Sequence, residues 1–460
     1  MIFSSPEFVY LFFPICFLLY LGISQIKAVW PALSFLVIAS VIYYGVWEPG
    51  YIWILVTSIG VNYLLSALMR RSDRSAKTAM WLGMCFNLAA LFYFKYFAFA
   101  TEIAQMLGLR ETSVAAMMLP LGISFFTFQQ ITFLIDRSNG VLEHPSLLDY
   151  SLFVSFFPQL IAGPIVHHSE IMPQFASVRV SWDATARGLY VFAIGLSKKV
   201  LIADEVAKLA NLGYANTESL GFVDAWIVSL CYTLQLYFDF SGYSDMAVGI
   251  GLVFGVRLPW NFLSPYQATN ISQFWRTWHV TLSRFLKDYV YIPIGGSHGS
   301  KARTAINLIL TMLIGGVWHG AGWTFVLWGL IHGVALAGYH LLRSKLTRVP
   351  TIVGWAVTLL LVHFGWVFFR STTIEQSLTM LGQMMSPSVS NWSYRQEAWV
   401  AFPYMLVGLF IALCCRNTAA IESRLKLSIW DGVYAACLLA TSLVWILGQF
   451  AAPEFLYFDF

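Results

Sequence analysis

Residues 304–342 read TAINLILTMLIGGVWHGAGWTFVLWGLIHGVALAGYHLL, two apolar runs that meet at the glycine-rich segment GGVWHGAG. A helix needs about 20 apolar residues to cross the hydrocarbon core of a bilayer, and each run has this length. The pattern recurs along the chain, and we predict membrane spans at 7–24, 29–47, 51–69, 80–99, 115–135, 304–321, 323–342, 351–369, 398–415 and 428–450. The sequence therefore predicts an all-α, polytopic membrane protein.

The composition agrees with this fold class. Hydrophobic residues make up 58% of the chain and charged residues only 11%, whereas soluble chains carry about 25% charged residues. Apolar runs continue from end to end, so we expect one membrane-embedded domain over 1–460, with N-terminal helices in 1–135, a core in 150–342 and C-terminal helices in 351–460. The basic residues form short clusters and no aromatic-interleaved stripe, which excludes a nucleic-acid partner and leaves membrane lipids as the surroundings.

These basic clusters predict the orientation of the chain, because Lys and Arg gather in cytoplasmic loops. If every cluster is placed in the cytoplasm, successive spans cross the membrane in alternating directions without conflict, and both termini lie outside. The clusters are Arg70, Arg71, Arg74 and Lys77; Lys301 and Arg303; Arg343, Lys345 and Arg348; and Arg416, Arg424 and Lys426.

The middle of the chain is less regular. Asp239 and Asp245 stand between two short apolar runs, and we expect them to fix helix breaks or to cap helix N-termini. Lys198 and Lys199 are expected to extend to the membrane interface. Irregular backbone is tolerated at membrane depth only inside protein or beside water, so we expect re-entrant or cavity-lining segments here. The segments concerned are 153–166, 189–202, 222–238 and 246–256.

Residues 271–296, ISQFWRTWHVTLSRFLKDYVYIPIGG, have the periodicity of an amphipathic helix at the interface. Arg276, Ser283 and Lys287 share its polar face, and His279 falls at the border of the two faces. One interpretation is a surface helix with Trp and Arg at headgroup level, and the other is a functional helix. The apolar face comprises Phe274, Trp278, Leu282, Phe285 and Tyr289.

His319 lies in the glycine-rich break, far along its span from the cytoplasmic end. Ionisable groups within spans are costly and usually mark function, but a lone buried histidine can also simply pack against Trp318 and bond a carbonyl. His332 is interpreted as structural. The chain has no GxSxG, P-loop or HExxH pattern, and the pair His167-His168 has no third ligand at metal spacing, so no metal site is expected.

The stretch 275–296, followed by 307–333, resembles the membrane-bound O-acyltransferase superfamily, in particular its bacterial alginate O-acetylation branch. The resemblance covers nearly the whole chain, because further blocks follow in the order of that branch. These blocks are 1–14, 92–97, 120–136, 155–166, 234–251 and 365–370.

The resemblance implies a ring of membrane helices around a central tunnel, in which an acyl donor from the cytoplasm meets an outward acceptor. The family's catalytic histidine falls on His319 and its second histidine on His279. Thr277 departs from the family pattern, in which a second Arg often follows Trp-Arg, so an Arg pair for the donor is in doubt. Residues expected to bind substrate are Arg276, Lys287, Asp288, Trp318 and Asn307.

The same resemblance implies transfer of an acetyl group across the bacterial inner membrane to an exported polysaccharide such as alginate. The donor would be acetyl-CoA, used as a substrate with no bound cofactor. The partners would be a periplasmic SGNH-type acetyltransferase and polysaccharide export machinery, and both chain termini would face the periplasm. Transfer of D-alanine, or transfer to peptidoglycan or cellulose, stays open. A transporter or flippase and a non-catalytic scaffold are the rival classes, and the lack of a clear internal repeat weighs against a transporter.

Overall fold

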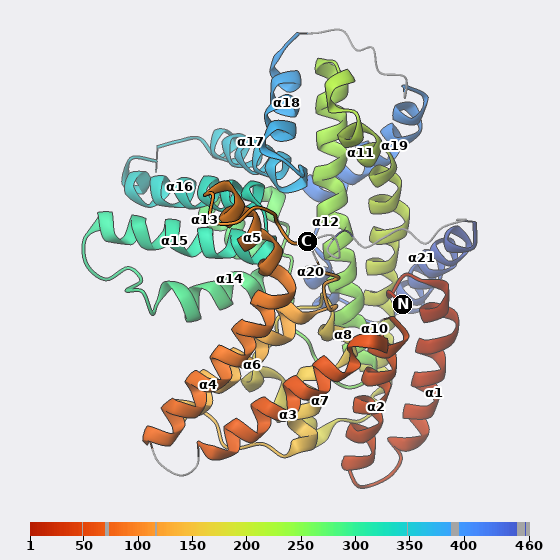
Figure 1. The fold of residues 1–460 in the computed structure, drawn as a ribbon. Helices are drawn as coiled ribbons and strands as arrows, with labels where there is room; N and C mark the ends of the chain where they lie inside the picture. The colour runs from red at the N-terminus through yellow and green to blue at the C-terminus, as the bar shows by residue number, and fades with distance from the viewer. Residues whose placement is uncertain are drawn as a thin grey trace. The chain divides into compact units, whose positions relative to one another are not determined.

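A computed structural model describes residues 1–47, 49–69, 73–115, 117–346, 348–387, 395–448 and 456 of the chain (Figure 1). Its regular elements are all helices, and no strand occurs among these residues. Within the described ranges, seven helices are long and apolar enough to cross a membrane. They are Trp30–Trp47, Pro49–Leu68, Arg74–Met106, Trp323–Leu346, Thr351–Arg370, Gln396–Cys414 and Ile429–Gly448. The predicted all-α, polytopic class is confirmed.

The contacts divide the chain into two compact units. The first comprises residues 1–192, 246–259 and 427–432. In it, α4 packs against α3 and α6, and α2 packs against α7. The helices of this unit that matter below are α2 (Trp30–Trp47), α3 (Ile52–Leu68), α4 (Asp73–Leu91), α6 (Ile123–Ser138), α7 (Leu147–Ser155) and α9 (His168–Ile171).

Buried amides join these helices. Asn62 of α3 and Asn87 of α4 exchange two hydrogen bonds of 3.2 and 2.7 Å. Gln130 of α6 donates to Ser58 of α3 at 2.8 Å and accepts from Tyr150 of α7 at 3.0 Å. Because lipid offers no hydrophobic drive for association, such polar pairs and close packing hold membrane helices together.

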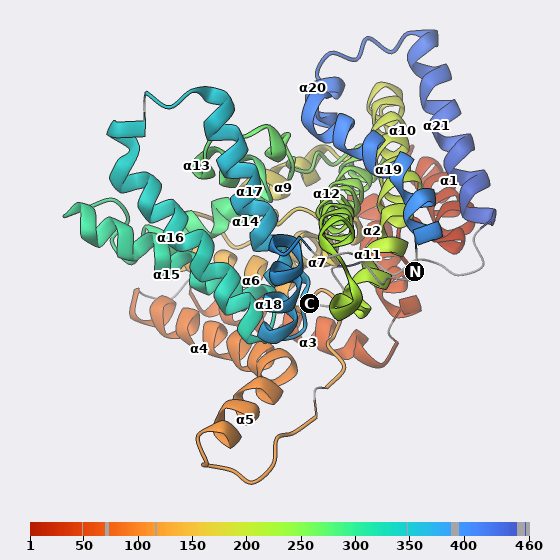
Figure 2. The same cartoon turned by 90° about the horizontal axis from the view of Figure 1, so that it is seen from above.

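The second unit comprises residues 193–245, 260–426 and 433–460. Its helices α15 and α16 run side by side as a hairpin (Figures 1 and 2). Glycines permit this contact: a Cβ on Gly329 would lie 2.5 Å from the Met312 carbonyl oxygen, and one on Gly333 would lie 2.9 Å from Ile309 Cα. The unit also contains α13 (Ile271–Thr277), α14 (Val280–Leu286), α15 (Lys301–His319), α16 (Trp323–Leu346), α17 (Thr351–Arg370), α18 (Ile374–Met385) and α19 (Arg395–Cys414).

The helix α12 (Phe222–Val253) corrects one prediction. It is continuous over 32 residues, where a break had been expected. Asp239 and Asp245 neither break nor cap it, because lysines neutralise both carboxylates. Lys199 Nζ lies 2.6 Å from Asp239 Oδ1, and Lys198 Nζ lies 2.6 Å from Asp245 Oδ2.

The two lysines themselves were also mispredicted. Lys199 is 3% exposed and contacts Asp204 as well, at 2.7 Å, so it lies in the protein interior and not at the interface. Lys198 also donates to the Thr418 hydroxyl at 2.8 Å. Both begin a π-helical stretch, Lys198–Ala203, that follows α10 (Trp182–Ser197).

Three predicted spans differ from the structure. The span 115–135 is wrong in its first part, because α6 begins only at Ile123, after Gly122 in a left-handed conformation (φ 71°). The span 304–321 corresponds to α15, which is not among the seven long apolar helices. The first span is the shorter apolar helix Glu7–Ile23.

Candidate active site

The segment 271–296 is not the single amphipathic helix that its periodicity predicts. Helix α13 ends at Thr277 and α14 begins at Val280; between them Trp278 is extended and His279 is left-handed, with φ 43° and ψ 54°. Positive φ is uncommon for a residue other than glycine. The chain is therefore sharply kinked at His279.

The segment that begins at Asn261 stabilises this kink. Val280 N donates to Asn261 O at 2.9 Å, and Leu263 N donates to Thr277 O at 2.9 Å. Buried backbone groups must find such partners, and here a distant segment supplies them in place of the helix. The border position predicted for His279 is wrong, because the kink buries the side chain fully.

The His279 ring is held in one orientation. Its Nδ1 lies 3.1 Å from Asn261 Oδ1, which also accepts from the Thr281 backbone N at 3.2 Å and hydroxyl at 2.9 Å. The Phe240 ring packs edge-on against the imidazole at 4.8 Å. Burial holds the pKa of His279 well below its usual range, so the ring is neutral.

His319 is the last residue of α15 and is also buried. Aromatic rings surround it edge-on: Trp318 at 4.9 Å, Trp328 at 5.1 Å and Phe369 at 5.2 Å between ring centroids. The His279 ring lies at a centroid distance of 6.4 Å. The structure thus brings together the two histidines predicted for catalysis, although 40 positions of the sequence separate them.

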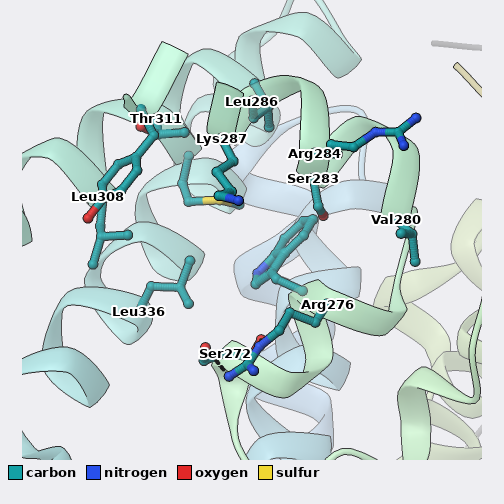
Figure 3. Close-up of a pocket in the computed structure, with 13 residues that line it drawn as sticks. Ser272, Arg276, Val280, Ser283, Arg284, Leu286, Lys287, Leu308, Thr311 and Leu336 are labelled. Atoms are coloured by element: carbon teal, nitrogen blue, oxygen red, sulfur yellow. Dashed lines mark hydrogen bonds between the residues drawn. The ribbon is translucent and has the colours of Figure 1, made fainter. Parts of the chain in front are cut away.

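A cavity of about 360 Å³ is formed by α13, α14, α15, α16 and the π-helical stretch Lys287–Tyr291 that follows α14 (Figure 3). Its polar lining is cationic, and no carboxylate occurs among the residues that line it. Figure 3 shows Lys287 reaching toward the space between the helices and Arg284 extending away from it. Arg276 is held by Ser272, whose hydroxyl accepts from Nη2 at 3.1 Å. The polar lining residues are Ser272, Arg276, Ser283, Arg284, Lys287, Tyr291 and Thr311.

The cavity adjoins the histidines through shared elements. Val280, which follows His279, lines it, as does Ser283, whose backbone N donates to His279 O at 3.0 Å. Trp275 also lines it and contacts the Trp328 ring at 5.7 Å, which in turn contacts His319. Neither histidine is itself among the lining residues.

Only two of the five residues predicted to bind substrate line the cavity. Arg276 and Lys287 line the cavity, but Asp288, Asn307 and Trp318 do not. Asn307 Nδ2 donates to the Gly296 carbonyl at 2.9 Å and so fixes a loop. Asp288 is 42% exposed and 3.8 Å from Lys287 Nζ. Trp318 packs against both histidine rings, at centroid distances of 6.2 Å from His279 and 4.9 Å from His319.

Sequence reasoning missed Asn261, because nothing in its neighbourhood indicates that it will contact a histidine 18 residues later. His332 was interpreted as structural. Its Nδ1 accepts from Trp275 Nε1 at 3.3 Å, and its ring packs on Trp328 at 4.8 Å. It therefore holds Trp275, which lines the cavity, against α16.

The reasoning that excluded a metal site is wrong in one respect. His167 and His168 do have a third potential ligand nearby, because Asp136 Oδ2 lies 2.8 and 2.9 Å from their Nε2 atoms. Asp136 lies on α6, and its distance in sequence hid it.

Known proteins similar to this chain identify the class of protein to which it belongs. The model of the membrane-bound O-acyltransferase family matches residues 41–382, which include both histidines and the cavity. The chain therefore belongs to the membrane-bound O-acyltransferase family, and it is a multi-pass membrane enzyme of the O-acyltransferase class. The resemblance inferred from the sequence is confirmed.

Three proteins similar to this chain have names that specify different acceptors. The peptidoglycan O-acetyltransferase of Helicobacter pylori is 40% identical over 100% of this chain and 98% of its own length. The probable alginate O-acetylase of Pseudomonas aeruginosa is 39% identical over 84% of this chain and 75% of its own. The teichoic acid D-alanyltransferase of Bacillus subtilis is 28% identical over 54% of this chain and 68% of its own.

Proposed function

We propose that this enzyme moves an acetyl group from cytoplasmic acetyl-CoA across the bacterial inner membrane, for O-acetylation of an exported glycan. The observation that carries the proposal is the approach of His279 and His319 to 6.4 Å beside a cationic cavity. The names of two relatives, an O-acetyltransferase and an O-acetylase, support acetyl as the group transferred.

The chemistry requires a base. A thioester is already activated, so a hydroxyl nucleophile needs only to lose its proton as it attacks the carbonyl carbon, after which the C–S bond breaks and the thiol leaves. A neutral imidazole suits this proton transfer, which is worth roughly 100- to 10,000-fold in rate. His319 is the general base, and it returns the proton to the leaving thiolate. His279, neutral and fixed by Asn261, positions the reacting groups.

The cationic cavity suits the donor. Coenzyme A carries phosphates, and Arg and Lys side chains bind phosphate through charge-assisted hydrogen bonds. Arg276 lies on α13, Lys287 begins the π-helical stretch Lys287–Tyr291 after α14, and both side chains line the cavity. A volume of about 360 Å³ lies within the range of small-molecule sites, about 300–1,000 Å³.

The acceptor is an exported polysaccharide such as alginate, reached through a periplasmic SGNH-type acetyltransferase and export machinery. Both termini then face the periplasm, as the basic clusters predict. Peptidoglycan is a second candidate acceptor, favoured by the similarity to the H. pylori enzyme over nearly the full length of both chains.

The experiment compares cells with and without the gene. Ester-linked acetate is measured by mass spectrometry separately in the peptidoglycan and in the exported polysaccharide. The fraction that loses acetate on deletion, and regains it on complementation, identifies the acceptor. Unchanged acetate in every surface glycan would contradict the proposal. Labelled acetyl-CoA supplied at the cytoplasmic face of sealed membrane vesicles tests the donor, since D-alanyl transfer would leave that label unused.

A further inference from the structure

The first unit contains a cluster of three potential metal ligands that the acyl-transfer site does not use. Asp136 lies near the C-terminal end of α6, and His167 and His168 lie at the start of α9. Asp136 Oδ2 is 2.8 Å from His167 Nε2 and 2.9 Å from His168 Nε2, and the three donor atoms all lie within 4.8 Å of one another. Two imidazoles thus converge on a single carboxylate oxygen.

This convergence depends on the backbone at the start of α9. Neighbouring side chains of an extended chain point in opposite directions, but His167 is the N-cap residue, at φ −96° and ψ 140°, and His168 is already helical. The turn brings the two rings to a centroid distance of 4.2 Å. Both Nε2 atoms therefore face α6.

The burial of the cluster fits an ion-binding site. The His168 side chain is 4% exposed, Asp136 13% and His167 25%. The donor atoms are thus largely withdrawn from water, while the His167 side leaves a path for an ion to enter. Metal binding requires both imidazoles to be unprotonated, so the three ligands together carry the single negative charge of the carboxylate, which attracts a cation.

We propose that Asp136, His167 and His168 bind a divalent transition-metal ion, with zinc as the best match. Two histidines and one carboxylate form a common three-residue ligand set for zinc, with the fourth position open to water. Tetrahedral bonds of about 2.0–2.2 Å place donor atoms about 3.4 Å apart. The observed oxygen–nitrogen distances need to open by only about half an ångström, which a small rotation of the side chains provides.

Ser169 supplies the outer partner that such a site requires. Its hydroxyl lies 2.6 Å from His167 Nδ1. When Nε2 binds a metal, Nδ1 carries the hydrogen and donates it to an oxygen, which fixes the ring and raises its basicity. Ser169 Oγ is close enough to accept that hydrogen, and this bond would replace the one in which Nδ1 accepts from the Ser169 backbone N at 3.4 Å. The bound ion then joins the end of α6 to the start of α9, two segments about 30 residues apart.

The same heavy-atom positions also suit two ordinary hydrogen bonds from Nε2–H to Asp136, so the test must detect the ion directly. Full-length protein is purified in detergent with a tag that contains no histidine, stripped with a chelator and titrated with Zn²⁺ against a chromophoric competitor. Elemental analysis after gel filtration gives the stoichiometry. The expected result is one zinc ion per chain.

Variants locate the ion. Asp136→Asn and His168→Gln each remove a ligand and should abolish binding in the titration. Ser169→Ala keeps all three ligands and should weaken binding about 10- to 100-fold. His298→Gln, at an exposed position of the second unit, is the matched control and should bind like the wild type.

Cobalt gives a readout that does not depend on any variant folding. Co²⁺ bound by the wild-type protein in a four-coordinate nitrogen and oxygen site should show strong visible absorption bands that added Zn²⁺ removes. Two results would overturn the proposal. One is wild-type protein that retains no zinc and shows no cobalt bands; the other is zinc that Asp136→Asn and His168→Gln leave fully bound. The three residues would then be a hydrogen-bonded cluster only.

Discussion

His279 Nδ1 lies 3.1 Å from Asn261 Oδ1. An amide oxygen can only accept, so Nδ1 must carry the hydrogen of the neutral ring, and the lone pair belongs to Nε2. The same oxygen accepts from both the backbone N and the hydroxyl of Thr281. One amide therefore fixes the tautomer of His279 and stabilises the first turn of α14.

Asn261 is thus a positioning residue, and Asn261→Asp should reveal it. A carboxylate in place of the amide preserves the contacts but favours the imidazolium, so it raises the pKa of His279. If His279 acts as a neutral ring, acetyl transfer should now be lost at the acidic end of the pH range and recover at higher pH. The measurement is the pH profile of transfer in reconstituted vesicles. A purely structural role predicts a uniform loss at all pH values, and such a result would contradict this assignment.

The cationic cavity predicts a defect in donor binding. Arg276→Gln and Lys287→Gln each remove one charge-assisted contact, worth about 1.5–3 kcal/mol. The KM for acetyl-CoA should rise about tenfold or more in each variant, whereas kcat should change little, because neither side chain contacts the histidines. Lys301→Gln, which removes an exposed charge outside the cavity, serves as control. A loss of kcat with unchanged KM would show that the cavity does not hold the donor.

Gly320 follows His319 directly and has no room for a side chain. A Cβ there would overlap the Phe325 ring. Gly320→Ala should therefore displace the end of α15 and with it His319, and overpacking of this kind costs about 1–3 kcal/mol. The rate of acetyl transfer should fall by a larger factor than this loss of folding free energy alone explains. Gly338→Ala in α16, where a Cβ meets nothing within 4 Å, should be neutral; equal effects of the two substitutions would refute this argument.

The buried ion cluster predicts a large loss of stability that is independent of catalysis. Lys199→Met leaves Asp204 and Asp239 buried without their cation, and breaking a buried pair from one side costs about 3–5 kcal/mol. The melting temperature in detergent should drop strongly. The matched control is Lys208→Gln, since Lys208 is 60% exposed and pairs with Glu205, three residues earlier on the same helix. A melting temperature unchanged by Lys199→Met would contradict the proposed stabilising role.

The fold class could be predicted from the sequence because run length and apolar composition alone decide whether a helix can cross a bilayer. The errors arose wherever a partner distant in sequence decides the structure. Asp239 suggested a helix break until Lys199 was seen to neutralise it. The kink at His279 depends on Asn261, which periodicity cannot reveal.

The cavity and the histidine pair of the candidate site also differed in how far the sequence alone could predict them. Arg276 and Lys287 were predicted together because both lie on one polar face of a helical pattern, and both line the cavity although the kink at His279 separates them. The approach of His279 to His319 followed from family resemblance and not from spacing. Asp136 was missed beside His167 because α6 and α9 meet only in the folded chain.

The most direct test of the account is the rate of acetyl transfer by His319→Ala in reconstituted vesicles. The vesicles contain labelled acetyl-CoA, and His298→Gln protein is measured in parallel. If His319 is the general base, the rate should fall by roughly 100- to 10,000-fold, with normal insertion and gel-filtration behaviour. A His319→Ala protein that transfers acetyl at nearly the control rate would contradict the account.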